Sequence, residues 1–169
     1  HRVDRRQRQM CIRDSSASGT NQHTGTVAVG YGTLASATTA TANTVMGYNA
    51  ATSNQTGISN VVVGYQAADA DTNGDANVII GKDAFGNVAG ADPDYNVAIG
   101  VNSLLGESSS TCARNIAVGY ETLKEATSAV NNVAIGYNAG LSVTTGNSNI
   151  MIGKNAGDSA QSANQNVII

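Results

Sequence analysis

The chain contains few of the residues that fill an ordinary globular core. Among its 169 residues there is no tryptophan, one phenylalanine and one proline, and only 12% are charged. A domain of this length normally buries several large aromatic side chains at its centre, so these absences exclude a conventional globular core. The 19 glycines and the many short side chains instead predict a narrow core built from stacked layers.

Residues that carry chemistry are also scarce. Cys11 and Cys112 have no CxxC partner and no neighbouring histidine, and His1 and His23 are isolated from any pair of acids. These features argue against a disulfide framework, a thiolate metal site and nucleophilic catalysis. The aliphatic residues do not recur at every sixth position as they do in hexapeptide-repeat acyltransferases. We therefore predict a protein that is not an enzyme.

Positive charge is concentrated in the first residues. Residues 1–14 hold five arginines and two aspartates, whereas the rest of the chain holds four lysines or arginines against ten acids. We interpret residues 1–14 as a non-native or disordered basic tail read through from a sequencing adapter, with a basic arm for nucleic acid or anionic lipid as the alternative. Residues 15–25 form a lead-in segment and residues 26–169 one repeat domain, for which we expect neither a nucleic-acid partner nor direct membrane insertion.

A glycine closes a short apolar segment eight times, at regular intervals. Successive glycines are 17 or 19 residues apart, and a ninth copy, Asn166 to Ile169, follows the same pattern. Such a period predicts an all-β parallel β-solenoid, or β-roll, with eight complete coils and a truncated ninth. The repeat glycines are Gly30, Gly47, Gly64, Gly81, Gly100, Gly119, Gly136 and Gly153.

An asparagine stands four residues before the glycine in eight of the nine copies, and Thr26 is the exception. Equivalent side chains in a parallel solenoid lie roughly 4.8 Å apart, so the amides can form hydrogen bonds along the stack. We predict a structural ladder of Asn43, Asn60, Asn77, Asn96, Asn115, Asn132, Asn149 and Asn166.

The segment between asparagine and glycine predicts a strand that is apolar on both faces. Numbering each coil from its glycine, positions −3 and −1 are Val or Ile almost everywhere, and position −2 is also apolar. We expect positions −3 and −1 to form the coil's own core, together with Tyr31, Tyr48, Tyr65, Tyr120 and Tyr137 at position +1. Position −2 would then face a partner chain, with the glycine allowing close approach of another backbone. This pattern predicts a homotrimer with the strands nearest its axis, and a polar strand in the outer half of each coil.

The repeated motif resembles the head repeats of trimeric autotransporter adhesins and the related repeats of phage tail fibres. The resemblance covers about residues 26–169 and rests on N-V-A-I-G-Y-N-A-G at Asn132 to Gly140, with similar segments at Asn60 and Asn115. It implies a left-handed parallel β-roll in a tight trimer. Adhesin heads usually have a shorter repeat with Ser where this chain has Asn, a difference that favours phage-like or environmental fibres.

The function that follows from the resemblance is structural. We expect an extracellular segment of an adhesin or fibre, on the outer surface of a cell or in a virion tail fibre, that presents a surface to host cells, matrix protein or glycans. One alternative is a tail-fibre shaft that acts only as a passive spacer. Another is an ice-binding solenoid, with threonines at position +8 forming a flat array: Thr38, Thr72, Thr127 and Thr144.

One acidic segment predicts a metal site. Oxygen ligands alternate around a glycine turn at Asp69, Asp71, Asn73 and Asp75, in the manner of a calcium loop. Asp75 and Asp92 both stand at position +11 of successive coils, so we expect these two carboxylates to lie side by side and attract a cation. Ile80 stands where a helix-flanked calcium loop has its bidentate Glu. The alternative is that these acids are solvated turn residues, and no other cofactor is predicted.

Overall fold

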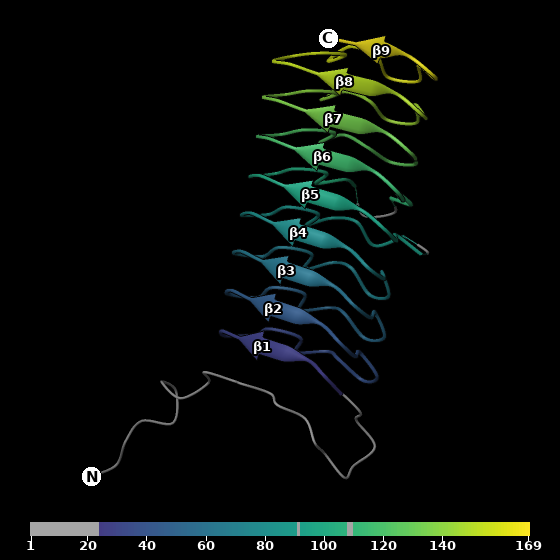
Figure 1. Ribbon diagram of the computed structural model, residues 1–169. Helices are drawn as coiled ribbons and strands as arrows, with labels where there is room; N and C mark the ends of the chain where they lie inside the picture. Colours follow the sequence, from purple (N-terminus) through teal and green to yellow (C-terminus); the bar gives the residue numbers. More distant parts are fainter. Residues whose placement is uncertain (1–23, 91, 108–109) are drawn as a thin grey trace, which may run out of the picture.

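The computed structural model describes residues 24–90, 92–107 and 110–169, so the predicted basic tail lies outside the described residues. This part of the chain is a parallel β-solenoid of about eight turns, in which each coil contributes one short strand to a single nine-stranded sheet (Figure 1). The strands are β1 (Val27–Val29), β2 (Thr44–Met46), β3 (Val61–Val63), β4 (Val78–Ile80), β5 (Val97–Ile99), β6 (Ile116–Val118), β7 (Val133–Ile135), β8 (Ile150–Ile152) and β9 (Val167–Ile168). The predicted fold class is therefore confirmed.

The strands stack in sequence order with one constant register. Val61 pairs with Val78, and Val78 pairs with Val97 although 19 rather than 17 residues separate them. The additional residues of the two longer coils are therefore accommodated outside the sheet. The expected polar strand in the outer half of each coil was wrong: the described residues form only these nine strands and one isolated bridge, between Ala113 and Val130.

The interior is lined by position −2, not by positions −3 and −1. Val45, Ile79 and Ala98 are at most 1% exposed, whereas their neighbours in the same strands are partly exposed. Our assignment of the two strand faces was therefore reversed. The physical reason is the alternation of side chains: the buried asparagine at −4 and the apolar residue at −2 share one face of the strand.

The opposite walls of the interior come from the same chain. Small residues at +3 and larger or variable ones at +4 and +7 face the strand, so each coil closes its own core without a partner. In six of the eight complete coils residues −2 and +4 compensate for each other in size; the exceptions are Ile79 with Phe85 and Ala134 with Gly140. Val45 pairs with Ala51, Ala98 with Leu104, and Met151 with a glycine, which keeps the narrow interior filled.

The repeat glycines are required by the stacking of coils within one chain. Their φ angles lie between 128° and 148°, a region that side chains rarely adopt. A Cβ on Gly81 would collide with the carbonyl oxygen of Gly100 in the next coil, and the other repeat glycines that have a successor are placed in the same way. The close backbone approach that we predicted is thus present, but between coils rather than between chains.

None of the described residues forms a helix with the length and apolar character needed to cross a membrane.

Candidate functional site

The outward side of the sheet is the most unusual surface of the molecule. Positions −3 and −1 alternate with the buried position −2 and therefore point away from the core. Together with the residues at +1 they form what we call the strand face, which extends over all nine strands. Its most exposed apolar members, each between 37% and 92% exposed, are Val27, Met46, Val61, Ile80, Val101, Ile116, Ile135, Ile150, Ile152, Val167 and Ile169.

Tyrosines at +1 border the strand face in two stacked groups. Ring centroids are 5.3 Å apart between Tyr31 and Tyr48, 5.4 Å between Tyr48 and Tyr65, and 5.2 Å between Tyr120 and Tyr137. These five rings are 43% to 57% exposed, so the prediction that they pack in the core was wrong. They nevertheless form ladders along the solenoid, because position +1 repeats at the spacing of the coils.

Lysine replaces tyrosine at the end of each ladder. The Lys82 Nζ lies 6.0 Å from the ring centroid of Tyr65, and the Lys154 Nζ lies 5.9 Å from that of Tyr137. Both geometries fit cation–π contacts at an exposed site, which contribute about 0.5–1 kcal/mol. The strand face is therefore largely apolar and aromatic, with isolated positive charges at the ends of its tyrosine ladders.

The predicted asparagine ladder is present, and all its members are buried except the last, Asn166. The Asn43 Oδ1 accepts the backbone N–H of Asn60 at 2.8 Å, and the Asn43 Nδ2 donates to the carbonyl of Gly57 in the return turn of its own coil at 2.8 Å. The same pair of bonds recurs in the following coils, at Asn60 and Asn77 among others. From Asn96 onward the amides also bond to one another, at 3.0 to 3.3 Å. The ladder ties the strand of each coil to its return turn and to the next coil.

A second ladder lies at position +11, and it changes our interpretation of the acidic segment. The Asp75 carboxylate accepts the N–H of Ile58 at 2.7 Å, and the Asp94 carboxylate accepts the N–H of Asp75 at 2.8 Å. The expected pairing of Asp75 with Asp92 was wrong, because the two additional residues of that coil place Asp94 in register. Asp92 instead accepts a hydrogen bond from the Asn73 amide at 3.2 Å.

The five predicted calcium ligands do not converge. Asp71 points into the interior and accepts the N–H groups of Asn73 and Gly74, at 3.2 and 2.8 Å, while Asp69 lies near Gln66 on the outer surface. Within the described ranges no three His, Cys, Asp or Glu residues come together in a way that could hold a metal ion. The arrangement thus gives no support to the calcium site, and each of these acids instead bonds to backbone or amide groups.

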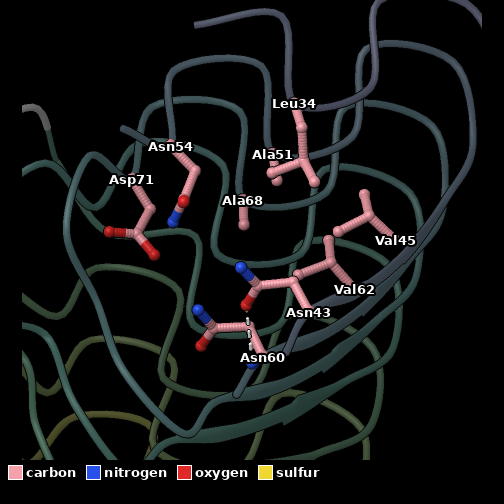
Figure 2. Close-up of a pocket in the computed structure, with 9 residues that line it drawn as sticks. All are labelled: Leu34, Asn43, Val45, Ala51, Asn54, Asn60, Val62, Ala68 and Asp71. Atoms are coloured by element: carbon pink, nitrogen blue, oxygen red, sulfur yellow. Dashed lines mark hydrogen bonds between the residues drawn. The ribbon is translucent and has the colours of Figure 1, made fainter. Parts of the chain in front are cut away.

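Asp71 and Asn54 occupy equivalent positions on the same wall of the interior, in successive coils (Figure 2). Both are almost fully buried, and the Asn54 Oδ1 has no hydrogen-bond partner. The space beside them, which Val45, Val62 and the small side chains of the opposite wall also line, holds no room for a water molecule. Burial raises the pKa of Asp71 to about 6, with smaller contributions from the charges of Asp94 and Asp75.

Two other predicted features have structural roles. The hydroxyls of Thr38, Thr127 and Thr144 donate to backbone carbonyls of the next coil, at 3.0 to 3.1 Å, so they are not free to match an ice lattice. Cys112 is buried, and burial raises the pKa of its thiol to about 12, which keeps it in the unreactive neutral form. Cys11 lies outside the described residues.

The strand face could have been recognised from the sequence. Because side chains alternate along a strand, the assignment of the asparagine ladder to the interior also assigns position −2 to the interior. Comparison with known proteins adds no further identification: no family model matches the chain, and neither a curated protein nor a solved structure shows significant similarity to it.

Proposed function

We propose that this chain is a non-catalytic segment of an extracellular fibre, of the cell-surface adhesin or virion tail-fibre type, that assembles as a homotrimer. The observation that carries the proposal is the strand face, an apolar and aromatic surface that continues along the whole solenoid. Soluble monomers rarely expose apolar patches of this extent, and such patches commonly mark sites of association.

The position of the strand face favours lengthwise packing of parallel copies. The aliphatic residues at positions −3 and −1 recur in every coil, and polar residues interrupt the strand face only at a few places such as Thr44 and Lys82. A second copy laid alongside therefore meets an equivalent residue at each level, and burial of these side chains contributes about 25 cal/mol for each Å² removed from water. Three copies around a common axis agree with the left-handed trimeric β-roll that the resemblance to adhesin head repeats implies.

In such an assembly the outer turns stay exposed, including those of the two longer coils. We infer that these turns present the surface for attachment to a host cell, a matrix protein or a glycan. A trimer that binds none of these would act as a passive spacer, which the uniform register of the coils also suits.

Sedimentation equilibrium of the 169-residue chain tests the assembly. The expected result is a mass three times that of the monomer, 17.1 kDa. A charge at the exposed Ile80 or Ile135, as in Ile80→Glu and Ile135→Glu, should convert the trimer into folded monomers, whereas the same charge at the exposed outer residue Gln55 should leave it intact. A wild-type chain that remains monomeric at high concentration, with the circular dichroism of a folded sheet, would contradict the proposal.

A further inference from the structure

One coil departs from the repeat at a position where the backbone conformation does not require glycine. Five residues after the repeat glycine, the other complete coils carry a side chain: Ala35, Thr52, Asp69, Leu105, Lys124, Leu141 and Asp158. The fourth coil has Gly86 there. Unlike the repeat glycines, Gly86 does not have a positive φ angle, so no turn demands a glycine at this point.

The missing side chain opens a hollow on the outer surface. A Cβ on Gly86 would lie 3.2 Å from the backbone carbonyl oxygen of Asp83, 3.2 Å from the Leu105 Cδ1 and 3.5 Å from the Asp69 Oδ1, and thus at the bottom of this space. The hollow has a volume of about 280 Å³ and spans three consecutive coils. Its lining consists of Gln66, Asp69, Asp83, Gly86, Asn87, Asn102 and Leu105.

The lining is rich in hydrogen-bonding groups, and several of them keep further bonding capacity. Gln66 donates to Asp69 over a long 3.4 Å. The Asn102 amide donates to Glu121 at 3.2 Å, and one oxygen of Asp83 accepts from Lys82 at 2.6 Å; neither Glu121 nor Lys82 lines the hollow. Carboxylates supply acceptors, and the amides of Gln66, Asn87 and Asn102 supply both donors and acceptors. Leu105 adds an apolar surface on one side.

We propose that this hollow binds one neutral sugar residue, through hydrogen bonds from its hydroxyls to Asp69, Asp83 and the neighbouring amides. The volume lies just below the roughly 300–1,000 Å³ typical of drug-sized ligands, which fits a single pyranose ring. Hydroxyl groups can donate to carboxylates and accept from amides, so they satisfy both kinds of group in the lining.

The charge of the hollow argues against other small ligands. Asp69 and Asp83 both line the hollow, so their carboxylates would repel an added anion. The same like-charge effect, together with burial, raises the pKa of Asp69. Phosphorylated, sulfated and carboxylated ligands are therefore disfavoured. A cation would need more carboxylates, and within the described residues no three acids converge.

A sugar site would name the class of ligand that the proposed attachment surface binds. Its biological role therefore rests on the proposed function. The test uses the 169-residue chain and the methyl glycosides of glucose, galactose, mannose and N-acetylglucosamine. Titration is followed by NMR, through the side-chain amide signals of Gln66, Asn87 and Asn102. We expect saturable shifts for at least one sugar, with a dissociation constant on the order of 1–10 mM.

Two variants locate the binding. Asn87→Ala removes one exposed amide and should weaken binding by at least about fivefold, the value of one hydrogen bond. Gly86→Ala places a methyl group in the hollow and should weaken binding at least as much, because the sugar and the methyl group cannot occupy the same space. Ala35→Ser, which enlarges the side chain at the same position of the first coil, is the matched control and should bind as the wild type does. Glucuronate should bind at least about tenfold more weakly than glucose.

The proposal is overturned by the absence of saturable shifts with all four sugars at about 100 mM. It is equally overturned by binding that Gly86→Ala leaves unchanged, or by glucuronate binding as tightly as glucose. Failure of this site and failure of the assembly are distinguishable: a trimer without sugar binding overturns only the site, and a sugar-binding monomer overturns only the assembly.

Discussion

The Asn96 Oδ1 accepts the backbone N–H of Asn115 at 3.0 Å, and the Asn96 Nδ2 donates to the carbonyl of Cys112 at 3.0 Å. One side chain therefore joins a strand, its return turn and the next coil. All of these groups are buried. The short strands, three residues in most coils, need such links because few backbone bonds connect each pair.

Replacement of Asn96 by Ala should destabilise the solenoid by about 2–4 kcal/mol, because it leaves the Asn115 N–H and the Cys112 carbonyl buried without partners. Chemical denaturation followed by circular dichroism measures this loss. The control is Gln161→Ala, at an exposed side chain, which should change the unfolding free energy by less than about 0.5 kcal/mol. Similar losses for the two variants would show that the ladder contributes little.

Met151 and Gly157 illustrate how the core is filled. A Cβ on Gly157 would lie 2.6 Å from the Met151 Sδ, so Gly157→Leu should be destabilising by about 1–3 kcal/mol. Met151→Ala alone leaves a cavity and should cost about 2–5 kcal/mol. The double variant recreates the Ala–Leu pair of the fifth coil, Ala98 with Leu104, and should be more stable than either single variant. A double variant whose loss equals the sum of the two single losses would contradict this pairing.

The architecture could be predicted from the sequence because the period of Gly81, Gly100 and the other repeat glycines directly reflects the stacking of coils. The asparagine ladder could be predicted for the same reason. The two strand faces were reversed because both are apolar, so hydrophobicity alone could not distinguish them. The burial of Asn77 decides between them, since it shares a face with Ile79.

The candidate site was harder to predict. The register between coils, and the direction in which each side chain points, are set only when the coil folds. Counting from the glycine aligns Asp75 with Asp92, whereas the longer coil places Asp94 in the ladder. Likewise, the alternation of acids at Asp69, Asp71 and Asp75 resembles a set of metal ligands when only the linear sequence is considered. Folding directs Asp71 inward, so the apparent pattern is divided between the interior and the surface.

The buried carboxyl of Asp71 makes stability depend on pH. Its pKa of about 6 in the folded chain is above the ordinary value of 3.8, so the folded state binds the proton more tightly than the unfolded state. This stabilisation is complete below about pH 3.8 and is lost as the pH rises through 6, at a cost of roughly 3 kcal/mol. Chemical denaturation at pH 4, 5, 6 and 7.5 measures this effect. The unfolding free energy of Asp71→Asn should depend less on pH than that of the wild type, and at pH 7.5 it should be larger. Asp158→Asn, at an exposed acid, is the control and should follow the wild type.

The corners of the coils hold strained residues that glycine should relieve. Ala76 is exposed, has a φ of 54°, and keeps its backbone bond to Ile58 whatever its side chain. The left-handed conformation costs an alanine about 1–2 kcal/mol, which exceeds the entropy that glycine loses on folding. Ala76→Gly should therefore raise the unfolding free energy by up to about 1 kcal/mol, whereas Ala70→Gly, at a position without a positive φ, should lower it.

Gly81→Ala should have the opposite and much larger effect. The φ of Gly81 is 142°, and an added Cβ would collide with the carbonyl of Gly100 in the next coil. Relieving this collision requires the backbone of one coil to shift, which breaks the register between the paired strands. We expect the sheet to lose pairing between β4 and β5, with amide exchange accelerated on both sides of that junction. Gly86→Ala, which has no positive φ, provides the comparison and should keep the protection of the wild type. Equal protection in Gly81→Ala would mean that the repeat glycine is not what allows the coils to stack.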